Sequence, residues 1–135
     1  MPVQRVGAPV DIAVSGLRAQ SARLNAISSN IANANTSRTD AGGPFRRLAV
    51  SLAAQADNLA GVSVSGVTPD MTTPFKSLYL PGHPDADAEG YVQMPNVDLP
   101  VEMMEMVDAT RAYQANAAVL KRYQEIMDLT TELLR

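Results

Sequence analysis

The strongest constraint on the fold is a seven-residue repeat of large apolar side chains in the last third of the chain. Seven residues span two helical turns, so such side chains form one row along an α-helix, and five consecutive steps exceed the three to four that indicate a coiled coil. We therefore predict a long helix from Leu99, capped by Asn96 or Asp98, with a left-handed seam against another helix. The repeat consists of Leu99, Met106, Tyr113, Leu120, Met127 and Leu134.

A second helix is expected near the N-terminus, from Pro9 and Asp11 to Asn35 or Thr36. Its apolar row is thinner, and small side chains flank it, which would let another helix approach closely. We expect the C-terminal helix to supply the hydrophobic seam, and the N-terminal helix to supply close packing. The row consists of Val10, Leu17, Leu24 and Ile31, and the small flanking residues are Ala19, Ala22 and Ala26.

The middle of the chain, residues 37–96, holds most of the Gly and Pro residues and several short alternating segments. Alternation predicts strands, and the Gly and Pro clusters predict turns between them. The expected strands lie within 46–52, 62–65, 75–80 and 91–94. The predicted fold is mainly α: residues 1–36 and 97–135 pair as a coiled-coil-like axial domain, and 37–96 form small β hairpins. The alternative, two helices packed on one sheet, is disfavoured because the β section is poor in apolar residues.

Composition excludes several classes of protein. A net charge of −3 gives no basic surface for nucleic acid or anionic lipid, and the absence of cysteine excludes disulfides and thiolate metal sites. No apolar run approaches the roughly 20 residues that a membrane-spanning helix needs. The first residues also lack the apolar core of a cleaved signal peptide. We therefore expect no membrane insertion, and export, if it occurs, by a route without a cleaved signal.

Enzymatic chemistry and cofactors are not expected. The single histidine, His83, lies in a turn between Gly82 and Pro84 with no nucleophile motif beside it, and no phosphate-binding loop is present. A hydrolase would have to use His83, so its substitution would test that alternative. We predict no catalytic residue.

One acidic segment resembles half of a calcium loop. Asp85, Asp87 and Glu89 occupy positions 1, 3 and 5, and Gly90 follows at position 6, but position 12 falls on Asn96 in place of the bidentate glutamate. These three residues are a weak metal candidate, and an acidic turn is the preferred interpretation.

Asparagine is unusually frequent toward the end of the N-terminal helix, at Asn25, Asn30, Asn33 and Asn35. Asn is costly inside a helix, so two interpretations stay open. Either the helix frays into a polar loop, or the carboxamides pair with polar partners and fix the register of neighbouring helices.

Three segments resemble the flagellar rod and hook axial proteins. Residues 15–36, SGLRAQSARLNAISSNIANANT, resemble the N-terminal signature of that family, and 94–98, MPNVD, with 110–116, TRAYQAN, resemble its C-terminal counterpart. The central PGHPDAD of 81–87 and GYV of 90–92 resemble the proximal-rod members.

The resemblance implies a non-enzymatic subunit of the proximal rod, the part of the flagellar drive shaft nearest the motor. It implies export without a cleaved signal, and assembly in the periplasm with further copies and other proximal and distal rod proteins. The export apparatus and the motor base are the remaining expected partners. The alternatives are a calcium-dependent binding module and a coiled-coil adaptor outside the flagellum.

The expected assembly residues lie on both terminal helices. On the N-terminal helix they are Leu17, Gln20, Leu24, Asn25, Ile27, Asn30, Ile31, Asn33 and Asn35, and on the C-terminal helix Met106, Tyr113, Gln114, Asn116, Leu120, Met127 and Leu134.

Overall fold

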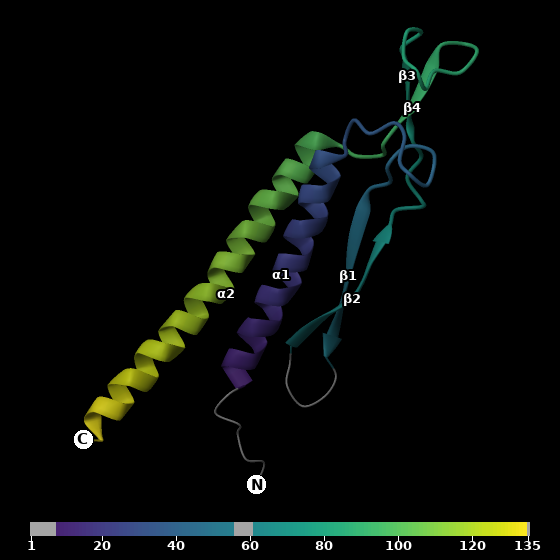
Figure 1. Ribbon diagram of the computed structural model, residues 1–135. Coiled ribbons are helices and arrows are strands. Elements are labelled where there is room, and N and C mark those ends of the chain that lie inside the picture. The colour runs from purple at the N-terminus through teal and green to yellow at the C-terminus, as the bar shows by residue number, and fades with distance from the viewer. Residues whose placement is uncertain (1–7, 56–60, 135) are drawn as a thin grey trace.

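The computed structural model describes residues 8–55 and 61–134 and confirms the predicted fold class: two terminal helices with two β hairpins between them (Figure 1). Residues 1–7, 56–60 and 135, which the sequence prediction places in the helical ends and in the β section, lie outside this description. The elements are α1 (Ala8–Ala32), β1 (Leu48–Gln55), β2 (Gly61–Pro69), β3 (Lys76–Tyr79), β4 (Tyr91–Met94) and α2 (Leu99–Leu133).

Helix α1 is the middle layer of the molecule. Helix α2 lies along one side of it, and the β1–β2 hairpin lies along the other (Figure 1). Among the described elements, α2 contacts neither β1 nor β2. The alternative of two helices packed on one sheet is therefore wrong, because the hairpin reaches only α1.

The two helices run antiparallel with a very close contact. Asn30 of α1 meets Glu102 of α2, whereas Gly16 meets Asn116. A Cβ atom on Gly16 would lie 2.8 Å from Asn116 Nδ2, so a larger residue there would require the Asn116 side chain to move. The close approach is seen at Gly16, and the buried apolar side chains on the two helices are mainly alanines. They are Ala13, Ala19, Ala26 and Ala109.

The large apolar row of α2 does not form the centre of this contact. The residues that face α1 are Glu102, Ala109 and Asn116, which form a separate seven-residue row. Within one chain, Met106 and Leu120 are half-buried, but Tyr113, Met127 and Leu134 are exposed. The seam inside the chain is thus made by small and polar side chains, and most of the large ones remain uncovered by described residues.

Helix boundaries follow the local chemistry. Asp98 is the N-cap of α2, as predicted, and its Oδ1 accepts from the N–H of Val101. Pro100 sits in the first turn, where no N–H donor is needed. Helix α1 ends at Ala32, before the predicted Asn35, because the hydrogen bonds tighten into turns: Ala34 N–H already donates to Ile31 O.

The β1–β2 hairpin is antiparallel, from Leu48 opposite Pro69 to Gln55 opposite Gly61, with a bulge between Ser51 and Leu52. Ser15 fastens it to α1: the Ser15 hydroxyl accepts from Val62 N–H at 3.1 Å and donates to Ile12 O at 2.7 Å. This contact holds the start of β2 against the first turns of α1.

The β3–β4 hairpin projects beyond the end where α1 stops and α2 begins (Figure 1). Tyr79 pairs with Tyr91 across the strands, and their rings meet edge to face at 5.2 Å. Gly90 precedes β4 with φ of 87°, and a Cβ atom there would overlap the Tyr79 ring. None of the described helices is long and apolar enough to cross a bilayer.

Candidate assembly site

A buried asparagine joins both helices to the first hairpin. Asn30 is fully buried, and its carboxamide pairs with the peptide of Leu48 as a neighbouring strand would: Oδ1 accepts from Leu48 N–H at 2.7 Å and Nδ2 donates to Leu48 O at 3.0 Å. Nδ2 also donates to Glu102 Oε2 at 3.0 Å. One side chain on α1 thereby fixes the position of both β1 and α2.

Glu102 is the largest fully buried side chain, with 0% of its surface exposed. Its Oε1 accepts from Arg47 Nε, and Arg47 Nη2 donates to Glu105 Oε1 at 3.0 Å. Burial acts to lower the pKa of Arg47, but the hydrogen bond and negative charge of Glu102 outweigh burial, and the pKa is raised. A buried carboxylate needs such a partner, because an unpaired charge in this position is strongly destabilising.

The same network extends to the loops that carry the second hairpin. Arg47 N–H donates to Asn96 Oδ1 at 2.8 Å, and Asn96 Nδ2 donates to the carbonyls of Asp70 and Thr73. We name Asn30, Arg47, Asn96, Glu102 and Glu105 the junction cluster. It ties α1, α2 and the segments beside both hairpins into one end of the molecule.

The predicted asparagines divide between the two interpretations. Asn30 forms the expected polar pairing, within one chain, whereas Asn33 belongs to the helix end: its Nδ2 donates to Ser29 O, and its Oδ1 accepts from Thr36. Asn25 and Asn35 are exposed. The interpretation as polar pairing therefore applies to Asn30, and the interpretation as a helix end applies to Asn33.

Three other predicted polar residues have distinct surroundings. Asn116 lies against Gly16, and its Nδ2 donates to Ala112 O at 3.0 Å. Gln114 is exposed. Gln20 Oε1 is buried and has no hydrogen-bond partner among the described residues.

The apolar residues predicted on α1 are more covered than those on α2. Ile27 is buried, and Leu17, Leu24 and Ile31 are half-buried. Helix α1 thus presents few large apolar side chains to the outside.

Sequence reasoning missed Arg47 and Glu102 as members of a site. It named no partner for Glu102 and placed Arg47 in the strand expected within 46–52. The available signal was the position of Glu102 seven residues before Ala109 and fourteen before Asn116, on the face that meets α1. A charged residue in an inward row requires a partner.

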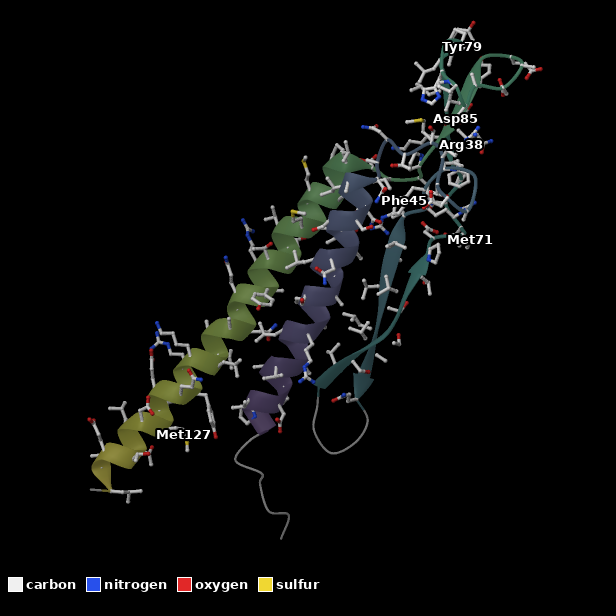
Figure 2. All side chains as sticks on the ribbon, in the orientation of Figure 1. Arg38, Phe45, Met71, Tyr79, Asp85 and Met127 are labelled. Atoms are coloured by element: carbon white, nitrogen blue, oxygen red, sulfur yellow. The ribbon has the colours of Figure 1, made fainter. Side chains whose placement is uncertain are left out.

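Helix α2 exposes large apolar side chains at both of its ends. The head patch consists of Leu99, Val101, Met103, Met104 and Val107, and the tail patch consists of Val119, Ile126, Met127, Leu129, Leu133 and Leu134. Figure 2 shows side chains standing away from α2 along its length, with Met127 labelled near the tail. Exposed apolar surface of this extent marks an interaction site.

The tail of α2 extends past the start of α1. Helix α2 has 35 residues and α1 has 25, a difference of about 15 Å at 1.5 Å per residue. Because the two helices are antiparallel, the described start of α1 lies beside α2 at about the level of Tyr123. There Pro9 helps to line an apolar hollow with Val119 and Ile126. No described residue lies alongside the last turns of α2 (Figure 1).

The acidic segment after β3 has other partners for its carboxylates. Asp85 Oδ1 lies 2.6 Å from Arg38 Nη2, and Asp85 Oδ2 accepts from Ser37 at 2.8 Å. Figure 2 labels Asp85 and Arg38 close to each other beside the second hairpin. Asp87 Oδ1 accepts from the N–H groups of Glu89 and Tyr91. Within the described ranges, no three possible metal ligands come together. The carboxylates of Asp85 and Asp87 serve a turn and its attachment to the loop after α1.

Comparison with known proteins agrees with this architecture. Residues 11–38 match the family described as "Flagella basal body rod protein", and residues 88–133 match "Flagellar basal body rod FlgEFG protein C-terminal". The two matched segments contain most of α1 and nearly all of α2, so the family signature lies on the helices that the junction cluster joins.

Several flagellar proteins are similar over nearly the whole chain. The flagellar basal-body rod protein FlgC of Salmonella typhimurium is 44% identical over 126 residues, which cover 91% of this chain and 93% of that protein. FlgC of Borreliella burgdorferi is 40% identical over 131 residues, which cover 82% of this chain and 86% of that protein. FlgC of Bacillus subtilis is 38% identical over 130 residues, with the same coverage. This chain therefore belongs to the FlgC family of flagellar basal-body rod proteins.

Proposed function

We propose that this chain, a structural and non-enzymatic subunit of the flagellar basal-body rod, occupies the proximal rod and passes torque from the motor toward the hook. The observation that carries the proposal is the unequal use of α2. Its small and polar face packs on α1, whereas the large apolar side chains at its two ends are uncovered. A helix built in this way has apolar surface left for neighbouring subunits.

In this proposal, residues 1–36 and 97–135 form the axial part of the subunit, and 37–96 form an outer contact layer. The α2 residues that meet neighbours include Met106, Tyr113, Leu120, Met127 and Leu134. On α1 the half-buried Leu17, Leu24 and Ile31 take a smaller share. Asn25, Asn35 and Gln114, which are exposed, supply polar contacts.

The junction cluster has a mechanical role. Torque passes through a subunit only if its helices and hairpins keep their relative positions under load. The Asn30 and Glu102 hydrogen bonds and the ion pairs of Arg47 connect these elements at one end. Buried and satisfied polar networks define a single arrangement of the elements they join.

The proposed partners are further copies of this chain, the other proximal and distal rod proteins, the export apparatus and the motor base. The proposed location is the rod within the periplasm, reached without a cleaved signal. The acidic composition and the absence of cysteine are compatible with this location.

Substitution on the head patch tests the proposal. Met104→Asp places a charge on a residue that is 68% exposed and lies on the side of α2 opposite Glu102, so the chain should fold but assemble poorly. Ala115→Asp is the matched control, because it adds the same charge to an exposed position of the same helix that belongs to neither apolar patch. We expect cells with Met104→Asp to swim poorly and to yield few basal bodies that contain the chain. Normal swimming and normal recovery of the Met104→Asp chain would contradict the proposal.

A further inference from the structure

Both hairpins of the chain have only two strands, so each strand has one edge that its partner strand does not cover. An uncovered edge presents a row of backbone N–H and C=O groups that can bind a further strand. Natural proteins usually protect such edges with charges, proline, bulges or covering residues. In both hairpins this protection differs between the two edges.

Hydrogen bonds at the start of the β1–β2 ladder identify the outward residues of β1. The N–H and C=O of Leu48 bind Asn30 of α1 and so point away from β2. Because outward and inward residues alternate along a strand, Val50, Leu52 and Ala54 are also outward. In agreement, the carbonyls of the two residues between them accept hydrogen bonds from serine hydroxyls of β2.

The two edges of this first hairpin are protected unequally. On β2, Ser15 of α1 binds the outward N–H of Val62, the bulge interrupts the strand, and Pro69 at its end has no N–H. On β1, Asn30 covers only the first residue. From 50 to 55 the strand has no charge and no proline, and no described group outside β2 binds its backbone. Strand β1 therefore has a free edge with three outward residues.

The second hairpin also has one protected edge and one free edge. On β4, Asp87 binds both backbone groups of Tyr91: its Oδ1 accepts from Tyr91 N–H at 2.7 Å, and its N–H donates to Tyr91 O at 2.8 Å. Gln93 is the one further outward residue of β4. Tyr79 lies opposite Tyr91 and is therefore outward on β3, together with Ser77. All four residues of β3 are exposed, and no described group outside β4 binds its backbone.

The two free edges lie apart within one chain. Strand β3 contacts none of the described elements outside its own hairpin, and this hairpin projects beyond the end of the helices where β1 begins (Figure 1). The free part of β1 extends in the opposite direction, toward the start of α1, since its last residue, Gln55, lies opposite Gly61 and beside Ser15. The edge of β3 can therefore reach a β1 edge only in another molecule.

Charge and stability favour the pairing of these two edges. Strand β1 has no charged residue, and the single charge of β3, on Lys76, is already paired with Asp98 at 3.8 Å. No unpaired charge therefore has to be brought between the strands. A two-stranded hairpin is marginally stable by itself, whereas three or more strands are stable, so both hairpins gain from the pairing.

We propose that β3 of one subunit adds to the free edge of β1 in a second copy of this chain, so that the two hairpins form one four-stranded sheet in the order β2–β1–β3–β4. Backbone hydrogen bonds provide the affinity in strand addition of this kind. The inference rests on the proposed function and names one contact in it. Two different edges meet, so every pair leaves one free β1 and one free β3, and repetition gives an open array. Pairing of β1 with β1 would instead give a closed dimer.

Disulfide cross-linking in isolated basal bodies tests the contact, because the chain has no cysteine of its own. Opposite residues of paired strands lie close enough for a disulfide. Cells that produce the Leu52→Cys chain together with the Ser77→Cys or the Tyr79→Cys chain should give a disulfide-linked dimer after mild oxidation. In the control, Val67→Cys on the protected β2 edge replaces Leu52→Cys, because the two residues are similarly exposed, at 47% and 43%. We expect a several-fold higher dimer yield with Leu52→Cys.

The possible results separate the inference from the proposed function. If the chains enter basal bodies and the two sets give equal yields, or no dimer, the strand addition is wrong and the rod function stands. The same holds if the Leu52→Cys chain alone gives as much dimer as the mixture, since β1 then pairs with itself. If the substituted chains are absent from basal bodies while the unsubstituted chain is present, the cysteines disturb assembly, and the second measurement below decides. If the unsubstituted chain is also absent, the proposed function fails and this inference fails with it.

The second measurement uses self-association of the purified full chain in sedimentation experiments. Ser77→Pro removes an outward N–H from the β3 edge, and Val67→Pro removes one from the β2 edge, while both leave the bonds to the partner strand in place. We expect Ser77→Pro to raise the concentration needed for self-association about tenfold, as for the loss of one or two hydrogen bonds, and Val67→Pro to change it within about threefold.

If Ser77→Pro does not fold, Ala54→Pro on the β1 edge is measured in its place, with the same expected effect. Equal effects of the substitutions on the free and the protected edges, or no self-association of the unsubstituted chain at any concentration, would overturn the pairing of β3 with β1.

Discussion

The two ends of α2 belong to one helix but differ in what holds them in place. At the head, Glu102 and Ala109 are completely buried, and the side chains of Asn30 from α1 and Arg47 from the loop before β1 hold the helix. At the tail, Leu129 is 59% exposed and Leu133 is 87% exposed, and no described residue covers them. The head is stabilised within one chain, whereas the described residues of the chain leave the side chains of the tail uncovered.

This difference indicates that the seven-residue repeat of α2 provides more than one contact surface. A seven-residue pattern places neighbouring rows about 50° or 100° apart around the helix, so one helix can offer different rows to different partners. Here the row that begins at Glu102 faces α1, and most of the larger side chains are left exposed by the described residues. Removing contacts at each end should separate the two roles.

The largest effect is expected from Glu102→Ala at the head. The substitution leaves Arg47 without its main partner and Asn30 with one hydrogen bond fewer. We expect the free energy of unfolding to fall by about 3 kcal/mol, the lower end of the range for breaking a buried ion pair, because the Arg47 side chain keeps 23% of its exposure. Urea unfolding followed by circular dichroism would measure the change.

Glu125→Ala is the matched control for Glu102→Ala. It is the same substitution on the same helix, but Glu125 pairs only with Arg122, 3.7 Å away on the surface. Such pairs contribute about 0–1 kcal/mol. If both substitutions had equal effects, the head would not be held by the junction cluster.

A smaller effect is expected between the two ends, at the contact of Gly16 with Asn116. Gly16→Ala would normally stabilise a helix by roughly 0.5–1 kcal/mol, but the new Cβ would lie 2.8 Å from Asn116 Nδ2. We therefore expect a net loss of about 1–3 kcal/mol, as for overpacked cores. In an Asn116→Ala background the same change should be neutral or stabilising, and a loss in both backgrounds would contradict the proposed clash.

Lowering the pH should destabilise the loop that contains Asp70, beside the junction cluster. The hydroxyl groups of Thr72 and Thr73 donate to Asp70 and hold the pKa of its carboxyl well below the usual value of 3.8. A lowered pKa in the folded state means that the ionised carboxylate stabilises the fold above pH 3.8, and that this contribution is lost as the pH falls further.

The substitution Asp70→Asn tests this pH dependence. The difference in melting temperature between the wild type and the variant should be largest near neutral pH and should shrink below about pH 4, where the wild type also loses the charge. A difference that stays constant from pH 7 to pH 3 would show that Asp70 acts through shape alone.

Much of the fold could be predicted from local pattern. The heptad predicted the start of α2 at Leu99, the capping residue Asp98 was among the two candidates, and alternation predicted all four strands. These features depend on residues close in sequence, which impose the local backbone conformation directly. The early end of α1 was missed, because the turn hydrogen bonds around Asn33 compete with continued helix.

The junction cluster could be predicted only in part. Asn30 was selected as a polar pairing residue, but its partners Leu48 and Glu102 lie 18 and 72 residues away in sequence. Which row of α2 faces α1 depends on the shape of both helices, and above all on the space left at Gly16. Periodicity identifies rows but does not rank them, so the large residues were expected at the seam that small ones form.

The smallest effect on stability is expected from Leu133→Ser in the tail. The side chain is exposed in the isolated chain, so its loss should change the free energy of unfolding by less than about 0.5 kcal/mol.

Hydrogen exchange should agree: amides near Ala109 should exchange slowly, because they open only with the whole fold, and amides of 126–133 should exchange quickly through fraying. Equal protection of the two segments in dilute monomer would show that the tail is held within its own chain. Protection of the tail should rise in assembled rod, because the neighbouring subunit then covers the side chains that a single chain leaves exposed.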